Sequence, residues 1–243
     1  MPIISSTESV FILTGAGISA ESGIPTFRDA GGLWRNYRFE DVASPYAWQR
    51  DPRLVWEFYS MRRRVVSAAK PNPAHFAVTR LGRDLRDRLF LCTQNVDNLH
   101  EQAGSARVIH MHGELFKSRC GICRLAPFAD MNTYEPPSEL PRCQCGGLIR
   151  PHICWFGEMP FDLDLIYKAL ENCTVFMAIG TSGVVEPAAS FVAHVCGHAR
   201  TIYVGPEEPS NRFSFTECHL GKAGELLPRL ISDGLDDSVG CSA

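Results

Sequence analysis

Short apolar runs recur along the chain, and each ends in a polar or glycine-rich segment. They are residues 9–14, 89–92, 108–111, 174–179 and 201–204. Short runs that are apolar throughout, rather than alternating, are typical of buried parallel strands. Between them, residues 73–85 and 163–173 carry apolar side chains at spacings of three and four, which predicts helices. This alternation predicts an α/β fold in which helices cover a parallel sheet.

Two stretches do not fit the alternation. Residues 30–71 are rich in Trp, Tyr and Arg but contain no good central strand. Residues 117–150 are rich in Cys, Pro and Gly and have little hydrophobic periodicity. We expect both to be insertions that form a smaller module beside the sheet.

Composition and charge exclude several classes of protein. The 243 residues are 45% hydrophobic and 21% charged, as in an ordinary globular chain, which excludes a disordered chain, a fibre and a coiled coil. The net charge of -3 gives no electrostatic signal for nucleic acid. No apolar run is long enough to span a bilayer, and residues 1–9 lack the basic start of a signal peptide. We therefore expect a cytoplasmic protein.

Four of the ten cysteines form two closely spaced pairs, Cys120 with Cys123 and Cys143 with Cys145. Two such thiolate pairs suit a tetrahedral zinc ion, and four protein ligands make the ion structural. A redox site would leave the second pair unexplained. The other six cysteines are scattered, mostly in apolar segments, so we expect buried thiols in a reducing compartment.

The first apolar run leads into Gly15-Ala16-Gly17-Ile18-Ser19-Ala20, which matches a dinucleotide-binding glycine pattern. Such glycines let backbone N–H groups approach a pyrophosphate, although a plain tight turn is the alternative. The following helix must stop early, at Gly23-Ile24-Pro25, so it does not lead into a second strand with a ribose-binding acid. This favours nucleotide binding and weakens the case for a dehydrogenase. A second, weaker turn of this kind is Gly180-Thr181-Ser182.

A polar segment, Gln94-Asn95-Val96-Asp97, follows the second apolar run, at the edge where α/β sheets bind ligands. His112 ends the next run, and its alternation with His110 puts both on one face, one in the core and one at the edge. Beside this polar cluster, His112 is a candidate general base. Asp97 is a candidate either for capping the next helix or for orienting an amide or ribose group.

Together these segments resemble the sirtuin family of NAD-dependent protein-lysine deacylases, and among them the desuccinylase subgroup. The resemblance is carried by residues 15–19, 21–28, 93–100, 112–113 and 150–158, by the four cysteines and by Gly180-Thr181-Ser182. It implies a Rossmann-like NAD-binding domain of residues 1–30, 74–113 and 149–243, and a smaller helical and zinc-binding module of residues 31–73 and 114–148.

The resemblance also implies the chemistry. The acyl-lysine amide oxygen attacks C1′ of the nicotinamide ribose, nicotinamide leaves, and His112 deprotonates a ribose hydroxyl that attacks the acyl carbon. The products are lysine, nicotinamide and O-acyl-ADP-ribose. Catalytic roles fall on His112, Asn95 and Asp97. The implied cofactor-binding residues are Gly15, Ala16, Gly17, Ser19, Glu21, Thr26, Phe27, Arg28, Trp34, Gln94, Asn95, Val96, Asp97, His112, Gly180, Thr181, Ser182, Gly205, Pro206, Glu207 and Ala223.

Substrate-binding residues follow from the same resemblance. Cys154, Trp155, Phe156 and Gly157 are expected to pair with the substrate backbone as an added strand. Ala43, Tyr59 and Arg62 match the acyl pocket of the desuccinylase subgroup. A planar guanidinium and a hydroxyl suit the carboxylate of a succinyl or malonyl group. Taken alone, the run of arginines at 62–64 would more often be a solvated helix face.

Three other functions stay open at this point. An NAD-dependent oxidoreductase is one, a non-catalytic nucleotide sensor is another, and ADP-ribosyl transfer to protein shares the first chemical step. We expect a monomer that acts on acylated proteins or peptides, with NAD and one zinc ion as cofactors.

Overall fold

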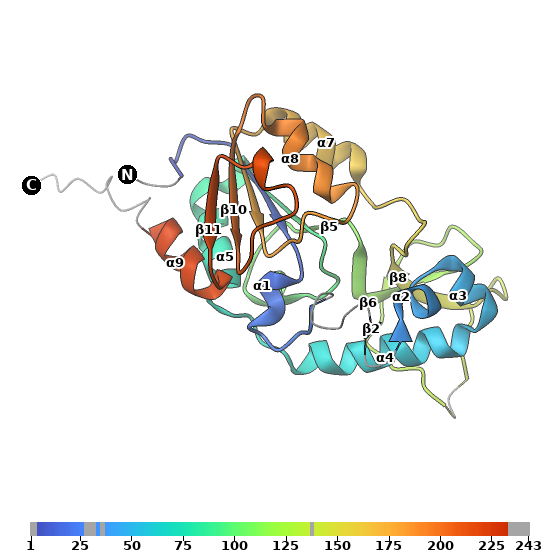
Figure 1. The fold of residues 1–243 in the computed structure, drawn as a ribbon. Helices are drawn as coiled ribbons and strands as arrows, with labels where there is room; N and C mark the ends of the chain where they lie inside the picture. The colour runs from blue at the N-terminus through green and yellow to red at the C-terminus, as the bar shows by residue number, and fades with distance from the viewer. Residues whose placement is uncertain (1–3, 27–32, 35–36, 137–138, 233–243) are drawn as a thin grey trace, which may run out of the picture.

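The computed structural model describes residues 4–26, 33–34, 37–136 and 139–232 (Figure 1). Its larger sheet has six strands in the order β11-β10-β9-β1-β4-β5, and every neighbouring pair is parallel. The strands are β1 (Val10–Thr14), β4 (Leu89–Thr93), β5 (Ile109–His110), β9 (Val175–Ile179), β10 (Arg200–Gly205) and β11 (Glu217–Leu220). The first five were predicted, so the α/β fold with a parallel sheet is confirmed.

Helices cover both faces of this sheet (Figure 1). One face packs on α5 (Pro73–Leu85) and α9 (Ala223–Ser232), the other on α7 (Leu163–Asn172) and α8 (Phe191–Val195). Strand β1 is buried throughout, and its alternate residues serve the two cores: Val10 and Ile12 face α5 and α9, while Phe11 and Leu13 face α7 and α8. A strand buried on both faces has to be apolar at every position, which explains the continuous run.

The helix α5 has the bounds that its apolar spacing predicts. Asn72 caps it by accepting a hydrogen bond from the Ala74 N–H at 2.9 Å, and Pro73 occupies the first turn, where its missing N–H costs nothing. The short helix after β1 is α1 (Gly17–Ala20), which ends before Gly23 as predicted. Another short helix, α6 (Leu99–Gln102), follows β4.

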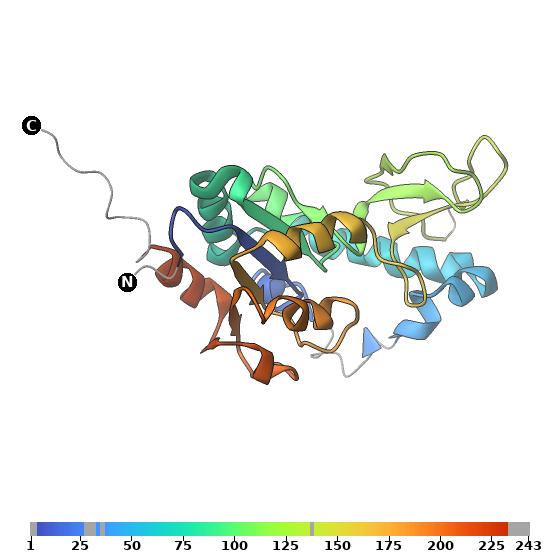
Figure 2. The same cartoon turned by 90° about the horizontal axis from the view of Figure 1, so that it is seen from above.

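A smaller module lies beside the sheet (Figure 2). It contains the helices α2 (Phe39–Val42), α3 (Pro45–Arg50) and α4 (Pro52–Ala68) and an antiparallel sheet in the order β7-β6-β8. The strands of that sheet are β6 (Gly113–Cys120), β7 (Phe128–Ala129) and β8 (Ile149–Ile153). Strand β8 pairs with β6, although the resemblance assigns residues from 149 onwards to the NAD-binding domain. The division into domains stays a prediction. Two short strands, β2 (Leu33–Trp34) and β3 (Tyr37–Arg38), precede α2.

In the part of the chain that the structure describes there are also three 3-10 turns: Arg86–Arg88, Ala188–Ser190 and Arg212–Ser214. Within the described ranges, no helix has both the length and the apolar character needed to cross a bilayer.

Candidate active site

The polar segments singled out in the sequence meet at the carboxyl end of the larger sheet. In-register pairing places Thr14 beside Thr93 and Ile179, so the segments that follow β1, β4 and β9 begin at the same level. The Gly15 N–H donates to the Ile179 carbonyl at 2.9 Å, and the Gln94 N–H donates to the Thr14 carbonyl at 2.9 Å. The structure therefore brings the two glycine turns and the Gln94–Asp97 segment together.

The two glycine turns pack backbone against backbone. The Gly17 N–H donates to the Gly180 carbonyl at 2.8 Å, and a Cβ on Gly17 would lie 2.7 Å from the Gly180 Cα. Gly180 has a φ of +61°, and a Cβ there would lie 2.4 Å from the Ile18 nitrogen. Only glycine fits at either position. The glycines thus have a structural reason in addition to the predicted approach of a pyrophosphate.

Asn95, Asp97 and Ser19 form a buried polar cluster under these turns. The Asn95 amide nitrogen donates to the Gly15 carbonyl and to the Ser19 hydroxyl, both at 3.2 Å. The Ser19 hydroxyl in turn donates to Asp97 Oδ2 at 3.1 Å, and the Leu99 N–H donates to Oδ1 at 3.1 Å. Asn98 occupies the N-cap position of α6, so Asp97 is not its N-cap residue; Asp97 stands one position earlier, where one oxygen accepts the first N–H of the helix and the other holds Ser19.

His112 lies between β5 and β6 with a defined tautomer. Its Nδ1 lies 3.1 Å from the Gln94 carbonyl oxygen, which can only accept, so Nδ1 carries the proton and Nε2 keeps its lone pair. Burial lowers the pKa of His112, although the Gln94 hydrogen bond opposes the shift. The imidazole is therefore neutral near pH 7 and able to accept a proton. The Gln94 side chain donates to the Thr181 hydroxyl at 3.2 Å, which joins this site to the second glycine turn.

His110 has a different environment from His112. Its Nδ1 bonds the Asn95 carbonyl at 3.0 Å and its Nε2 bonds Glu101 at 2.7 Å. Burial alone would lower the pKa of His110, but the Glu101 carboxylate and the Asn95 carbonyl raise it above the usual value. With two acceptors, this imidazole is an ion-paired core group, as the alternation with His112 predicted.

Sequence reasoning missed two buried histidines below the site. His100 Nε2 lies 3.0 Å from the Thr14 hydroxyl, and His75 Nε2 lies 3.4 Å from the Ser19 hydroxyl. The two rings stack edge to face with centroids 5.0 Å apart. Burial lowers the pKa of His75 to about 4 and that of His100 to about 3, so both are neutral. His75 forms a capping box with Asn72, and this pairing was the available sequence signal.

The three consecutive arginines of α4 have three different environments. Arg63 is buried, donates to the Leu115 carbonyl at 2.9 Å and pairs with Asp130 at 3.3 Å. Arg64 is exposed and pairs with Glu135. Arg62 is partly buried, with its Cζ 5.8 Å from the Phe58 ring centroid and 6.0 Å from that of Tyr59. The run is therefore not a solvated face, and only Arg62 is placed beside Tyr59.

The segment from Cys154 to Glu158 is fixed by hydrogen bonds at several atoms. The Cys154 N–H donates to the His112 carbonyl at 2.9 Å, and the Phe156 N–H donates to the Ala43 carbonyl at 3.1 Å. The Trp155 N–H donates to Glu158 at 2.9 Å. These donors already have acceptors, so an added substrate strand would have to use the remaining backbone groups. Phe156 is half exposed at 52%, which fits a surface that meets a substrate.

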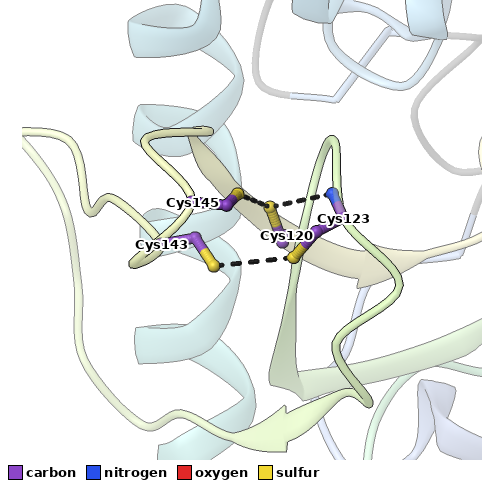
Figure 3. Close-up of side chains that lie close together, drawn as sticks. All are labelled: Cys120, Cys123, Cys143 and Cys145. Carbon is purple, nitrogen blue, oxygen red and sulfur yellow. Dashed lines mark hydrogen bonds between the residues drawn. The ribbon is translucent and has the colours of Figure 1, made fainter.

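The four predicted metal ligands come together in the smaller module (Figure 3). Cys120 Sγ lies 3.5 Å from Cys145 Sγ, and Cys123 Sγ lies 3.7 Å from Cys143 Sγ. All four sulfurs lie within 4.8 Å of one another. A tetrahedral zinc ion with bonds of about 2.3 Å needs sulfurs about 3.8 Å apart, so the cluster fits this ion. The N–H groups of Ile122 and Cys123 both point at Cys120 Sγ at 3.4 Å, which stabilises a thiolate.

The remaining predicted contacts lie around the carboxyl edge of the sheet. Glu21 accepts a hydrogen bond from the Gly224 N–H at 2.7 Å, which ties α1 to α9. A Cβ on Gly205 would lie 2.3 Å from the Tyr203 hydroxyl, which donates to the Thr181 carbonyl at 3.2 Å. Phe27, Arg28 and the Trp34 side chain lie outside the described residues. For these residues, as for every other predicted cofactor-binding residue, contact with the cofactor stays a prediction.

The expectation of buried thiols is partly wrong. Cys92 and Cys173 are buried, whereas Cys154 and Cys218 are only half-buried and Cys196 is exposed. Cys241 lies outside the described residues. Cys196 directly follows α8 and faces solvent, so the apolar residues next to it in the sequence do not indicate that it is buried.

Comparison with known proteins decides the family. Residues 15–187 match the Sir2 family model, which is more than half of the chain. The chain belongs to the Sir2 family. An NAD-dependent protein deacylase of Vibrio cholerae is 48% identical over 233 residues, 92% of each chain. The crystal structure of a Sir2 homologue in complex with NAD has a TM-score of 0.86 at 42% identity, and covers 94% of this chain and 90% of its own.

Another solved relative contains a bound acylated peptide. It is Sir2Af2 bound to a myristoylated histone peptide, with a TM-score of 0.71 at 32% identity, covering 94% of this chain and 92% of that one. The Sir2 fold and the four-cysteine cluster agree with the sirtuin resemblance drawn from the sequence.

Proposed function

We propose that this Sir2-family chain is an NAD-dependent protein-lysine deacylase that prefers succinyl and malonyl groups and retains some deacetylase activity. The relatives named NAD-dependent protein deacylase support the general reaction. The single observation that carries it is the tautomer of His112: the Gln94 carbonyl holds Nδ1–H, which leaves Nε2 unprotonated, and the Gln94 side chain reaches the second glycine turn.

Each polar group of the site has a role in this reaction. NAD supplies nicotinamide as a leaving group and a ribose hydroxyl as the acceptor of the acyl group. His112 accepts the proton of that hydroxyl, because its neutral imidazole is held by the Gln94 carbonyl. Asn95 and Asp97 hold the glycine turn and Ser19 in place, and with Gln94 they would hold the ribose and carboxamide of NAD. The turn at Gly180 and Ser182 holds the adenosine half.

The preference for acidic acyl groups follows from Tyr59 and Arg62. A buried carboxylate is costly unless it is paired and hydrogen-bonded. Arg62 offers a guanidinium fork beside the Tyr59 ring, and Ala43 leaves space because its side chain is a single methyl group. The chain offers no comparable benefit to an acetyl group, which has no charge to pair.

Product analysis by mass spectrometry tests this function. The protein is incubated with NAD and with matched acetyl-lysine and succinyl-lysine peptides. We expect free lysine, nicotinamide and O-acyl-ADP-ribose, with faster turnover of the succinyl peptide. A change in absorbance at 340 nm when substrate is added would indicate an oxidoreductase. A lack of nicotinamide release would indicate a nucleotide sensor, and transfer of ADP-ribose to protein would indicate an ADP-ribosyltransferase. Each of these results contradicts the proposal.

The predictions of a monomer and of a cytoplasmic location go with this function. We expect the enzyme to act as a monomer on acylated proteins in a reducing compartment. The scattered distribution of the cysteines supports such a compartment.

A further inference from the structure

Tyr59 and Trp155 join two segments of the smaller module through one buried hydrogen bond. Trp155 Nε1 lies 3.0 Å from the Tyr59 hydroxyl oxygen. Both residues are almost fully buried: Trp155 is 2% exposed and Tyr59 is 1% exposed. An indole N–H can only donate, so the Tyr59 oxygen must accept in this bond.

The bond decides what the Tyr59 hydroxyl can still do. A phenol has one proton to donate, and here the Trp155 bond does not use it. Within the part of the chain that the structure describes, no group accepts that proton. Burial raises the pKa of Tyr59 to about 12, although Arg62 and the Trp155 bond oppose the shift, so the hydroxyl keeps its proton at any physiological pH.

Trp155 itself is held from three sides. The Arg150 Cζ lies 3.3 Å from the centroid of the Trp155 ring, and Arg150 is fixed by two bonds to Glu158 at 2.6 and 2.9 Å. Glu158 also accepts the Trp155 backbone N–H. Trp48 packs on the ring at 5.8 Å. A cation over the indole face draws electron density from the ring and makes its N–H a stronger donor. The indole is therefore a rigid donor aimed at one oxygen.

We propose that Trp155 is a positioning residue for acyl specificity: its indole N–H occupies a lone pair of the Tyr59 hydroxyl and leaves the hydroxyl proton for a carboxylate oxygen of the acyl group. The inference rests on the proposed preference for acidic acyl groups. It adds a side-chain role to Trp155, whose predicted part in binding concerns the backbone alone. Without the indole donor, the hydroxyl is free to rotate and no longer presents its proton beside Arg62.

Trp155→Phe tests this role, because it keeps an aromatic ring and removes the N–H. The measured quantity is the ratio of kcat/KM for succinyl-lysine to kcat/KM for acetyl-lysine peptide, so that losses common to both peptides cancel. We expect this ratio to fall about tenfold, the value of one well-placed hydrogen bond to a charged group. An unchanged ratio overturns the proposal.

A double-variant cycle separates positioning from packing. In a Tyr59→Phe background, Trp155→Phe should change the ratio less than about twofold, because the hydroxyl through which it acts is gone. Additive losses would overturn the proposal. Trp56→Phe is the matched control: Trp56 is also buried and donates its indole N–H, but to the Ile149 carbonyl at 2.9 Å. It should leave the ratio unchanged.

A second measurement needs neither turnover nor a folded Trp155 variant. With indole nitrogens labelled by ¹⁵N, the four tryptophans give four side-chain N–H resonances. One of them should move in Tyr59→Phe, and the same resonance should move when succinyl-lysine peptide, but not acetyl-lysine peptide, is added to the unaltered protein. If no resonance responds to Tyr59→Phe, the proposal is wrong. If wild-type protein shows no succinyl preference while that resonance responds to Tyr59→Phe, the acyl preference fails and the hydrogen bond stands.

Discussion

The Nδ1 of His112 lies 3.1 Å from the backbone carbonyl oxygen of Gln94. The acceptor is a main-chain atom, so the orientation of the imidazole does not depend on the identity of side chain 94. The Gln94 side chain is consequently available for another partner and donates to Thr181 on the neighbouring turn. One residue thus fixes the His112 imidazole through its backbone and the turn at Gly180 through its side-chain amide.

His112→Asn should abolish most turnover while keeping the local structure. The asparagine amide can still donate to the Gln94 carbonyl, but it cannot accept a proton as a base. We expect kcat to fall about 10²–10⁴-fold, the usual contribution of a positioned general base. Exchange of labelled nicotinamide into NAD, which precedes the proton transfer, should fall far less. Equal losses in the two assays would contradict a role for His112 after nicotinamide leaves.

The pH dependence of turnover follows from the lowered pKa of His112. Burial keeps this pKa below its ordinary value of 6.5. A histidine that acts as a general base does so in its neutral form. The kcat/KM for peptide should therefore stay level from pH 8 to about 6.5 and decline only at lower pH. A decline that begins above pH 7 would indicate that another group limits the reaction.

The central parts of the fold could be predicted because the sequence carries their physics directly. A strand such as β1, buried on both faces, must be apolar throughout, and the amphipathic α5 has a cap and a proline at its start. The metal site could also be predicted, because its four ligands occur in the sequence as two closely spaced pairs of cysteines. The convergence of Gln94 and Gly180 followed from the geometry of parallel strands, whose carboxyl ends share one edge.

The missed features depend on tertiary contacts. Strand β11 is a partly exposed edge strand, and its residues Glu217–Leu220 show no apolar run. The histidines at 75 and 100 come from two different helices, and only the fold brings their rings together. The arginines at 62–64 are identical in type, and the rotation of about 100° per residue along α4 gives them different surroundings.

Arg62→Met should change acyl preference more than overall activity. It removes the guanidinium fork and leaves a long apolar side chain beside Tyr59. We expect succinyl-lysine turnover to fall by one to two orders of magnitude, about the value of a charge-assisted pair, and acetyl-lysine turnover to change much less. Arg64→Met is the matched control, because Arg64 lies on the same helix but is exposed and pairs with Glu135. Parallel losses on both peptides in Arg62→Met would refute the assigned pocket.

Removal of the metal should unfold the smaller module rather than block the chemistry directly. Cys120 ends β6 and Gly121 bonds Leu148, so loss of the ion frees the end of the three-stranded sheet. We expect one zinc per chain, and a Cys145→Ser variant with reduced zinc content and a lower Tm. Metal analysis and thermal unfolding check this. The exposed Cys196→Ser is the control and should retain both values. A Cys145→Ser variant with full zinc would contradict the four-cysteine site.

The stability of the fold should decrease as the pH falls below about 6.5. His75 and His100 have folded pKa values of about 4 and about 3, below the usual 6.5 of an unfolded chain. Between the folded and the unfolded pKa values, the unfolded state binds more protons than the folded state, so acid favours unfolding. The stability that the neutral histidines contribute is therefore fully present above about pH 6.5 and is lost as the pH falls towards about 4. The loss is on the order of 3 kcal/mol for His75 alone.

Urea unfolding at pH 7.5 and pH 5 measures this effect. The free energy of unfolding should be lower at pH 5 in the unaltered protein, and a His75→Gln/His100→Gln variant should lose much of the difference. His194→Gln is the control, because His194 lies on the exposed side of α8 and its substitution removes no buried imidazole. If the double variant keeps the full difference, other groups carry the acid sensitivity, and the two buried rings do not govern the acid limit of the fold.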